Sequence, residues 1–246
     1  MSETLLVNLG STRAAWRGPG GNGTDVHDGR PGELLASRLA AARPRRVVVG
    51  SVARAAVNEE LRSGVSRAWR LEPEFLEAAG ESHGVHNGYR DPARLGVDRW
   101  AAIVAAFHAA GGPLLVVDCG TALTLDYVDA EGMHHGGLIA PGLAAMRAAL
   151  AHTTRLPGEV LSGPVPGGSD WGRDTAEAVA GGCMGAVVGL IERARARVGA
   201  PDAAAASRLW ITGGDAEAVI THLPASWRHV PGLVLDGLAL LGGVAE

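Results

Sequence analysis

The sequence contains no lysine, so all 22 of its basic residues are arginines. This absence excludes a Walker-type phosphate loop, in which a lysine after the glycine-rich turn reaches the β- and γ-phosphates. The 26 acidic residues outnumber the basic ones, which gives a formal net charge of −4. The chain therefore has no excess of positive charge with which to bind the phosphate backbone of a nucleic acid. We therefore expect no nucleic acid among the partners.

Cysteine is almost as scarce. The two cysteines, Cys119 and Cys183, lie far apart, and neither belongs to a CxxC or Cys/His pattern. A zinc site or a disulfide framework therefore has little support, and both residues are predicted to be buried free thiols. His134 and His135 also lack partners at metal-ligand spacing, so we expect them at an exposed hairpin tip.

Long uninterrupted apolar runs are missing as well. The N-terminal residues MSETLL show no basic region followed by a long apolar stretch, and histidine, glycine and proline interrupt the run from Ala101 to Val117. We expect no membrane partner and predict a cytoplasmic protein. The 246 residues are 47% hydrophobic, which is enough to form the core of one large domain or two smaller ones.

Glycine and proline divide the chain into alternating strands and helices. In the first part we expect strands at 4–9, 13–16, 45–52 and 68–73, a loop at 18–32, and helices at 33–42, 55–63 and 94–110. In the second part we expect three strands between 113 and 141, helices at 144–152, at 174–198 and in the C-terminal tail, and a strand at 207–214. This order predicts an α/β protein.

One short pattern occurs twice, 110 residues apart. Leu6–Gly10 and Val116–Gly120 both read apolar, apolar, polar, any residue, glycine. The offset is the size of a small domain, which predicts a duplicated unit, with domains at 1–112 and 113–246 and a cleft between them. Each turn offers backbone N–H groups and a hydroxyl to a phosphate, and Asp118 offers a carboxylate to a cation beside it. The pattern is typical of an ATP clamp without a Walker loop.

Seven segments extend this interpretation to a family. They are, in order, LGSTRAAW, NGYRDPARLGVDRWAA, DCGTALTLDYV, GGLIAPGL, GRDT, ITGGDA and LVLDGLALL. Along nearly its whole length the chain resembles the type III pantothenate kinases, also described as Bvg accessory factor-like, in the actin-like ATPase superfamily. The resemblance implies duplicated ribonuclease H-like domains and a homodimer. It also implies transfer of the γ-phosphate of ATP to pantothenate, the first step of coenzyme A synthesis, with Mg²⁺ and a monovalent cation, K⁺ or NH₄⁺.

The resemblance also implies roles for individual residues. The residues implied to contact ATP are Asn8, Leu9, Gly10, Ser11, Thr12, Arg13, Ala14, Ala15 and Thr121. The residues implied to bind the substrate are Tyr89, Gly96, Val97, Asp98, Arg99 and Thr175, with Thr175 near the dimer interface. Asp98 is implied to be the catalytic proton acceptor and Asp118 the monovalent-cation ligand, while Gly213 and Gly214 are expected near the nucleotide.

The chemistry of the substrate residues suits these roles. A carboxylate at Asp98 can take the proton of a primary alcohol during phosphoryl transfer, and the guanidinium of Arg99 can hold a carboxylate. Each residue also has a plainer interpretation when taken alone. Asp98 and Thr175 are typical of helix N-termini, and Tyr89 is typical of an exposed loop.

The first turn departs from the family pattern Asp-x-Gly-Asn-Thr, because this chain has Asn8 and Ser11 at two of the five positions. Asparagine keeps one acceptor oxygen but loses the charge that attracts Mg²⁺. Two hypotheses follow: a working kinase with reduced activity, or a silent paralogue that binds nucleotide or pantothenate as a regulator. The retained Asp98 and Arg99 favour the enzyme. A third hypothesis, a sugar or acetate kinase, would differ in the acceptor site, and the segment NGYRDPARLGVDR favours pantothenate.

Overall fold

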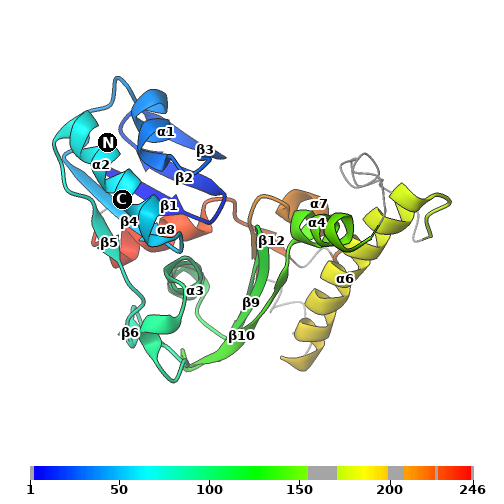
Figure 1. Ribbon diagram of the computed structural model, residues 1–246. Coiled ribbons are helices and arrows are strands. Elements are labelled where there is room, and N and C mark those ends of the chain that lie inside the picture. The colour runs from blue at the N-terminus through cyan, green and yellow to red at the C-terminus, as the bar shows by residue number, and fades with distance from the viewer. Residues whose placement is uncertain (1–2, 155–170, 199–207, 225–226, 245–246) are drawn as a thin grey trace. The chain divides into compact units, whose positions relative to one another are not determined.

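The computed structural model describes residues 3–154, 171–198, 208–224 and 227–244, and these form two compact units (Figure 1). The first unit comprises Met1–Gly112, Val128–Gly136 and Gly232–Glu246, and the second comprises Pro113–Tyr127 and Gly137–Pro231. The predicted boundary at residue 112 would assign the segments 128–136 and 232–246 to the second unit. In the structure both segments pack with the first unit.

The first unit is built on a five-stranded sheet with the order β3-β2-β1-β4-β5. The strands are β1 (Thr4–Leu9), β2 (Arg13–Gly18), β3 (Gly21–Val26), β4 (Arg46–Ser51) and β5 (Glu74–Leu76). β1 is antiparallel to β2 and parallel to β4. β3 lies in the predicted loop 18–32, so that prediction was wrong: Gly23 pairs with Trp16 and leaves room for its indole ring, which a Cβ at this position would strike.

Helices cover both faces of this sheet. The bounds are α1 (Pro31–Arg38), α2 (Ala55–Trp69), α3 (Val97–Ala110) and α8 (Leu233–Leu241), with the short elements β6 (Glu81–Ser82), β7 (Val85–His86) and η1 (Pro92–Arg94) before α3. Leu5, Val7 and Leu9 share one core with α1 and α2. Because side chains alternate along a strand, Asn8 lies on the opposite face, where its neighbour Gly50 approaches α8.

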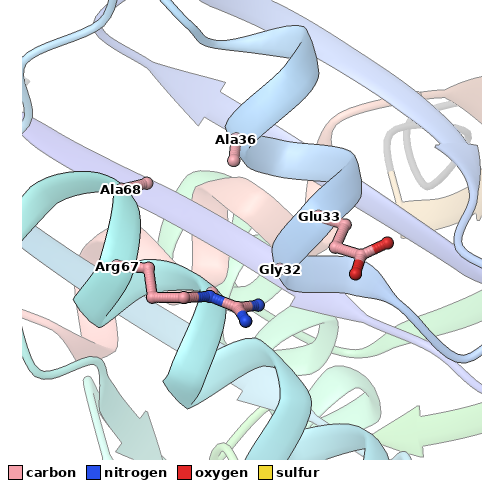
Figure 2. A pocket seen from close by; sticks show the side chains of 6 residues that line it. Gly32, Glu33, Ala36, Arg67 and Ala68 are labelled. Atoms are coloured by element: carbon pink, nitrogen blue, oxygen red, sulfur yellow. The ribbon is translucent and has the colours of Figure 1, made fainter.

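The helices α1 and α2 cross at two glycines. A Cβ on Gly64 would lie 2.4 Å from the Cα of Gly32, so neither position accepts a larger residue without a shift. The crossing leaves a pocket of about 360 Å³ beside it, lined by Gly32, Glu33, Ala36, Gly64, Arg67 and Ala68. Figure 2 shows this pocket from close by. None of the residues predicted to bind ATP or substrate lines this pocket. The same crossing explains why α2 continues through Gly64, beyond the predicted end at residue 63.

The second unit repeats the architecture of the first. Its strands are β8 (Leu114–Cys119), β9 (Ala122–Val128), β10 (His134–Pro141), β11 (Leu209–Thr212) and β12 (Arg228–His229), in the order β10-β9-β8-β11-β12. In both sheets the order is third, second, first, fourth, fifth, and the first and fourth strands are parallel. This shared order confirms the predicted duplication of an α/β unit.

The helices of the second unit are α4 (Leu143–Thr153), α6 (Thr175–Arg197) and α7 (Ala216–Ile220). α6 contributes Cys183, Met184 and Val187 to the same core as the strands β8, β9 and β11. Within the described ranges α6 is the one helix whose length and composition would suit a membrane span, a criterion that core helices of soluble proteins also meet. Of its 18-residue apolar window 28% is buried, and the buried residues belong to the core of the second unit.

Candidate active site

The first glycine turn joins β1 to β2. Asn8 and Leu9 end β1, Arg13 begins β2, and the amide of Gly10 donates to the carbonyl of Arg13 at 3.0 Å, which closes the turn. Leu9 and Ala14 are fully buried and anchor the two strands, whereas Ser11, Thr12 and Arg13 are exposed. Ala15 pairs with Asn8 across the hairpin. The apolar residues therefore fix a turn whose polar residues are accessible to a ligand.

Asn8 carries an unsatisfied oxygen at this turn. Its Oδ1 atom is buried and has no hydrogen-bond partner among the residues that the structure describes. A buried acceptor without a partner costs about 1–3 kcal/mol, which a donor or cation supplied by a ligand would offset. Mg²⁺ bound with a nucleotide takes oxygen ligands and usually keeps several waters, so a single amide oxygen fits its coordination, directly or through water.

The second glycine turn follows β8. Asp118 lies near the end of that strand and pairs with Thr212 of β11, while the amide of Gly120 donates to the carbonyl of Ala122 at 3.1 Å. Gly213 has a φ of +97°, and a Cβ there would lie 2.4 Å from Oδ1 of Asp118. Only glycine combines this left-handed conformation with such a close approach. β11 is thereby held against the Asp118 side chain.

Thr121 is exposed in this second turn, and its carbonyl accepts the amide of Gly142 at 3.0 Å. The structure therefore brings Asp118, Thr121 and Gly213 into the neighbouring turns after β8 and β11. Among the described residues no group of three or more His, Cys, Asp and Glu side chains gathers as a metal site. A cation at Asp118 would therefore need further oxygens from backbone, water or phosphate.

The environment of Cys119 makes its thiol unsuited to act as a nucleophile. Burial, followed by the charges of Asp118 and Asp215, raises the pKa of its thiol to about 12. A thiol with this pKa stays protonated at neutral pH and is a poor nucleophile. Burial also raises the pKa of Cys183, and both cysteines are free and buried, which confirms the prediction for them.

Asp215 follows Gly214 at the end of the β11 turn. Its amide donates to the carbonyl of Cys119 at 2.9 Å, which ties the ITGGDA segment to β8. Burial raises the pKa of its carboxyl, and the guanidinium of Arg147 partly offsets that effect.

The predicted substrate residues of the first unit lie together at the start of α3. Arg99 is 8% exposed, and its Nη1 atom donates to Oη of Tyr89 at 2.6 Å. The Cζ atom of the same guanidinium group lies 5.5 Å from the centroid of the Tyr89 ring. The structure thus brings a phenol and a guanidinium into direct contact.

Asp98 occupies the second position of α3, after Gly96 and Val97. Gly96 is the N-cap and makes no side-chain capping bond, while Oδ1 of Asp98 accepts the amide of Arg99 at 2.7 Å. A Cβ on Gly96 would lie 2.7 Å from that same oxygen, so glycine leaves room for the carboxylate. Asp98 therefore stabilises the first turn of the helix and directly precedes Arg99 in the chain.

His134 joins this cluster, which the sequence did not indicate. Its ring stacks on Tyr89 with centroids 6.1 Å apart and an interplanar angle of 13°, and the residue is fully buried. The prediction of an exposed hairpin tip was therefore wrong for His134. His135 is exposed, and its Nε2 atom lies 2.6 Å from Oδ2 of Asp129, a hydrogen bond that lowers the pKa of that carboxyl.

Thr175 is the exposed first residue of α6. The cap of this helix is Asp174, whose Oδ1 accepts the amide of Glu177 at 2.8 Å, and Oε2 of Glu177 accepts the amide of Arg173 at 2.8 Å. Capping is therefore assigned to Asp174 and not to Thr175. Thr175 lies on a different element from the turn at Asp118, although both belong to the second unit.

Solved structures of other proteins share this architecture. A crystal structure of a Baf family transcriptional activator from Campylobacter jejuni matches with a TM-score of 0.61 at 20% identity, covering 96% of each chain. The activator of the 2-hydroxyisocaproyl-CoA dehydratase from Clostridium difficile, with bound ADPNP, matches with a TM-score of 0.51 at 14% identity, covering 97% of this chain and 93% of that one. At these identities the likeness concerns the fold.

The family follows from the sequence comparisons. A family model described as type III pantothenate kinase matches residues 9–197. The type III pantothenate kinase of Azoarcus sp. (strain BH72) is 38% identical over 247 residues, which cover 96% of this chain and 89% of that protein. This chain belongs to the type III pantothenate kinase family, which confirms the resemblance found in its sequence.

Proposed function

We propose that this protein transfers the γ-phosphate of ATP to the primary hydroxyl of pantothenate, forming 4′-phosphopantothenate in the first step of coenzyme A synthesis. The observation that carries the proposal, in a chain of this family, is the hydrogen bond between Arg99 and Tyr89 at the start of α3, where Asp98 directly precedes Arg99 in the first turn of the helix. The cluster supplies a cation for the carboxylate of the substrate and a base for its hydroxyl. No finding favours the binding-only alternative.

Each substrate residue has a proposed task. Arg99 pairs with the pantothenate carboxylate, and Tyr89 accepts a hydrogen bond from Arg99, which leaves its own O–H to donate to the substrate. Asp98 accepts the proton that leaves the hydroxyl as the phosphoryl group arrives. Gly96 and Val97 shape the approach to Asp98, and Thr175 contributes a further hydroxyl contact.

The two glycine turns are proposed to bind the phosphates of ATP. The segment Asn8–Ala15 contacts the triphosphate through backbone amides and the hydroxyls of Ser11 and Thr12, and Thr121 adds a contact from the second unit. Mg²⁺ bound with ATP neutralises phosphate charge, and the Oδ1 atom of Asn8 is positioned to accept from its water shell. Asp118 holds a monovalent cation, K⁺ or NH₄⁺, which supplies positive charge in a chain without lysine.

A direct assay tests the function. Purified protein incubated with ATP, Mg²⁺, K⁺ and pantothenate is expected to form 4′-phosphopantothenate, identified by mass spectrometry. Parallel reactions with a hexose or with acetate in place of pantothenate test the sugar-kinase and acetate-kinase alternatives. Binding of ATP and pantothenate without product formation would contradict the proposal and support a regulatory protein.

Asn8→Asp is expected to lower the Mg²⁺ concentration for half-maximal activity by about 3- to 10-fold. A carboxylate attracts the metal or its water shell more strongly than a neutral amide, by about the difference between a charged and a neutral hydrogen bond. The measurement is a Mg²⁺ titration of the initial rate at fixed ATP and pantothenate.

The matched control for this change is Asn22→Asp, which adds the same charge at an exposed position of β3. Its titration curve should coincide with that of the wild type. Coincident curves for Asn8→Asp and the wild type would show that position 8 has no part in metal binding. A lower rate at every Mg²⁺ concentration would show that the added carboxylate repels the phosphates.

We also propose that the protein is a cytoplasmic homodimer that pairs through the outward face of α6. Gly182, Gly185 and Gly189 follow one helical face, and a Cβ added at any of them would meet nothing within 4 Å in the described chain. Glycine inside a helix costs about 0.8–1.0 kcal/mol relative to alanine, so three on one open face disfavour the isolated helix. A closely packed helix from a second copy would offset this cost, because small residues allow backbones to approach.

Gly185→Leu is expected to convert the dimer to a monomer of 25.1 kDa in light scattering coupled to size exclusion. The leucine side chain would separate the two backbones at their closest approach, while its helix propensity would stabilise α6 within each copy. The control Ala56→Leu adds a comparable side chain at an exposed position of α2 and should leave the mass unchanged. A wild-type protein that is monomeric, or a Gly185→Leu protein that stays dimeric, would contradict this interface.

A further inference from the structure

His27 follows β3 and is buried, with 5% of its surface exposed. Its ring makes two hydrogen bonds: Nδ1 lies 3.0 Å from the amide nitrogen of Gly29, and Nε2 lies 3.1 Å from the carbonyl oxygen of Gly10. A backbone amide only donates and a carbonyl only accepts, so Nδ1 must be the acceptor and Nε2 must carry the proton. The two partners therefore select one neutral tautomer of the imidazole.

The backbone of His27 holds the same turn. Its amide donates to the carbonyl of Thr12 at 3.2 Å, and its own carbonyl accepts the amide of Arg30, the N-cap residue of α1, at 2.6 Å. One buried residue thus binds the carbonyl oxygens of Gly10 and Thr12, the first and last residues of the turn. The contact with Arg30 connects this anchor to a helix packed on the sheet.

Holding the Gly10 carbonyl also sets the direction of the next amide. In a planar trans peptide the C=O and N–H groups point in opposite directions. The carbonyl of Gly10 is directed at the His27 ring, so the N–H of Ser11 points away from that buried ring. If the peptide rotated, it would present a carbonyl oxygen where an anionic ligand needs a donor.

We propose that His27 is a positioning residue for ATP, which fixes the Gly10–Ser11 peptide so that the Ser11 amide donates to a phosphate. The inference rests on the proposed function of this turn as the phosphate loop. His27 acts through the backbone of Gly10, without touching the nucleotide and without carrying charge. ATP binding should therefore depend on the hydrogen bond that Nε2–H donates to Gly10, and not on the volume of the ring.

Two amide substitutions separate the two hydrogen bonds of the ring. His27→Asn places an amide oxygen close to the position of Nδ1, so it retains the bond from Gly29 and loses the donor to Gly10. His27→Gln places an amide nitrogen close to the position of Nε2, so it retains the donor to Gly10 and loses the bond from Gly29. Both variants remove the aromatic ring, and asparagine leaves a space larger than glutamine does by one methylene group.

The dissociation constant of ATP is measured by calorimetry without pantothenate, beside the KM for pantothenate and the melting temperature. We expect His27→Asn to raise the ATP dissociation constant by about 3- to 10-fold, the equivalent of one hydrogen bond, and His27→Gln to stay within about twofold of wild type. The KM for pantothenate should be unchanged in both variants. The melting temperature should fall in both variants, and further in His27→Asn because its side chain is smaller.

Equal losses of ATP affinity in the two variants would show that the ring only fills space, and unchanged affinity in both would show that Gly10 needs no anchor. Either result overturns the proposal. A wild-type protein that binds ATP but forms no phosphopantothenate would contradict the proposed function and leave the role of His27 standing. Normal turnover of the wild type, with no difference in ATP affinity between the two variants, would contradict the proposed role of His27 and leave the proposed function standing.

Discussion

Asp98→Asn is expected to lower kcat by about 10²- to 10⁴-fold, the range that general-base assistance supplies. A mainly dissociative transition state would put the loss near the lower end, because proton transfer then matters less. Pantothenate binding, measured by calorimetry, should persist, since asparagine keeps the Oδ1 atom that accepts the Arg99 amide. The variant therefore separates the chemical step from the structure of the first turn of α3.

The control for Asp98→Asn is Asp91→Asn, a few residues earlier in the same segment. Asp91 is exposed, and its carboxylate accepts the amide of Ala93, a bond that asparagine also makes. Its turnover should match that of the wild type. An Asp98→Asn enzyme that turns over at the wild-type rate would rule out the role of Asp98 as proton acceptor.

Asp118→Asn is expected to lower kcat/KM for ATP by about 10- to 100-fold and to abolish the difference between K⁺ and Na⁺. A unit charge about 4 Å from a cation is worth up to about 4 kcal/mol at a protein surface, and solvent screening removes part of this. In the wild type the rate should rise when K⁺ or NH₄⁺ replaces Na⁺ at constant ionic strength.

The control for Asp118 is Glu131→Gln, which removes an exposed carboxylate from the hairpin between β9 and β10. It should retain the full response to K⁺. Equal wild-type rates in K⁺, NH₄⁺ and Na⁺ would contradict a monovalent-cation site at Asp118.

Local patterns predicted the strand ends that carry the site. Asn8 and Asp118 stand near the ends of buried apolar strands, and a glycine two residues later marks each turn, so alternation and turn chemistry were sufficient. The helix predicted from residue 94 was also found, although α3 begins at Val97 and residues 92–94 form the separate 3₁₀ helix η1. These features depend on residues close together in the chain.

Features that depend on distant partners could not be predicted. β3 has the sequence GNGTDV, which is typical of a loop and becomes a strand because Trp16 lies across from its central glycine. His134 is buried because Tyr89 provides a ring to stack on, and His27 because Gly10 and Gly29 satisfy both nitrogens. A histidine in a polar segment carries no local sign of such partners.

The first unit is completed by α8, a helix that is synthesised after the second unit. Gly237 of α8 packs directly against the backbone of Ala101 in α3, Asp236 pairs with Arg17 of β2, and the carbonyl of Gly242 accepts from Arg46. During synthesis, residues 3–112 therefore leave the ribosome long before the helix that completes their core. The part of the sheet that α8 covers therefore stays exposed while the whole second unit is translated. Chaperone contact and early proteolysis would be concentrated in that interval.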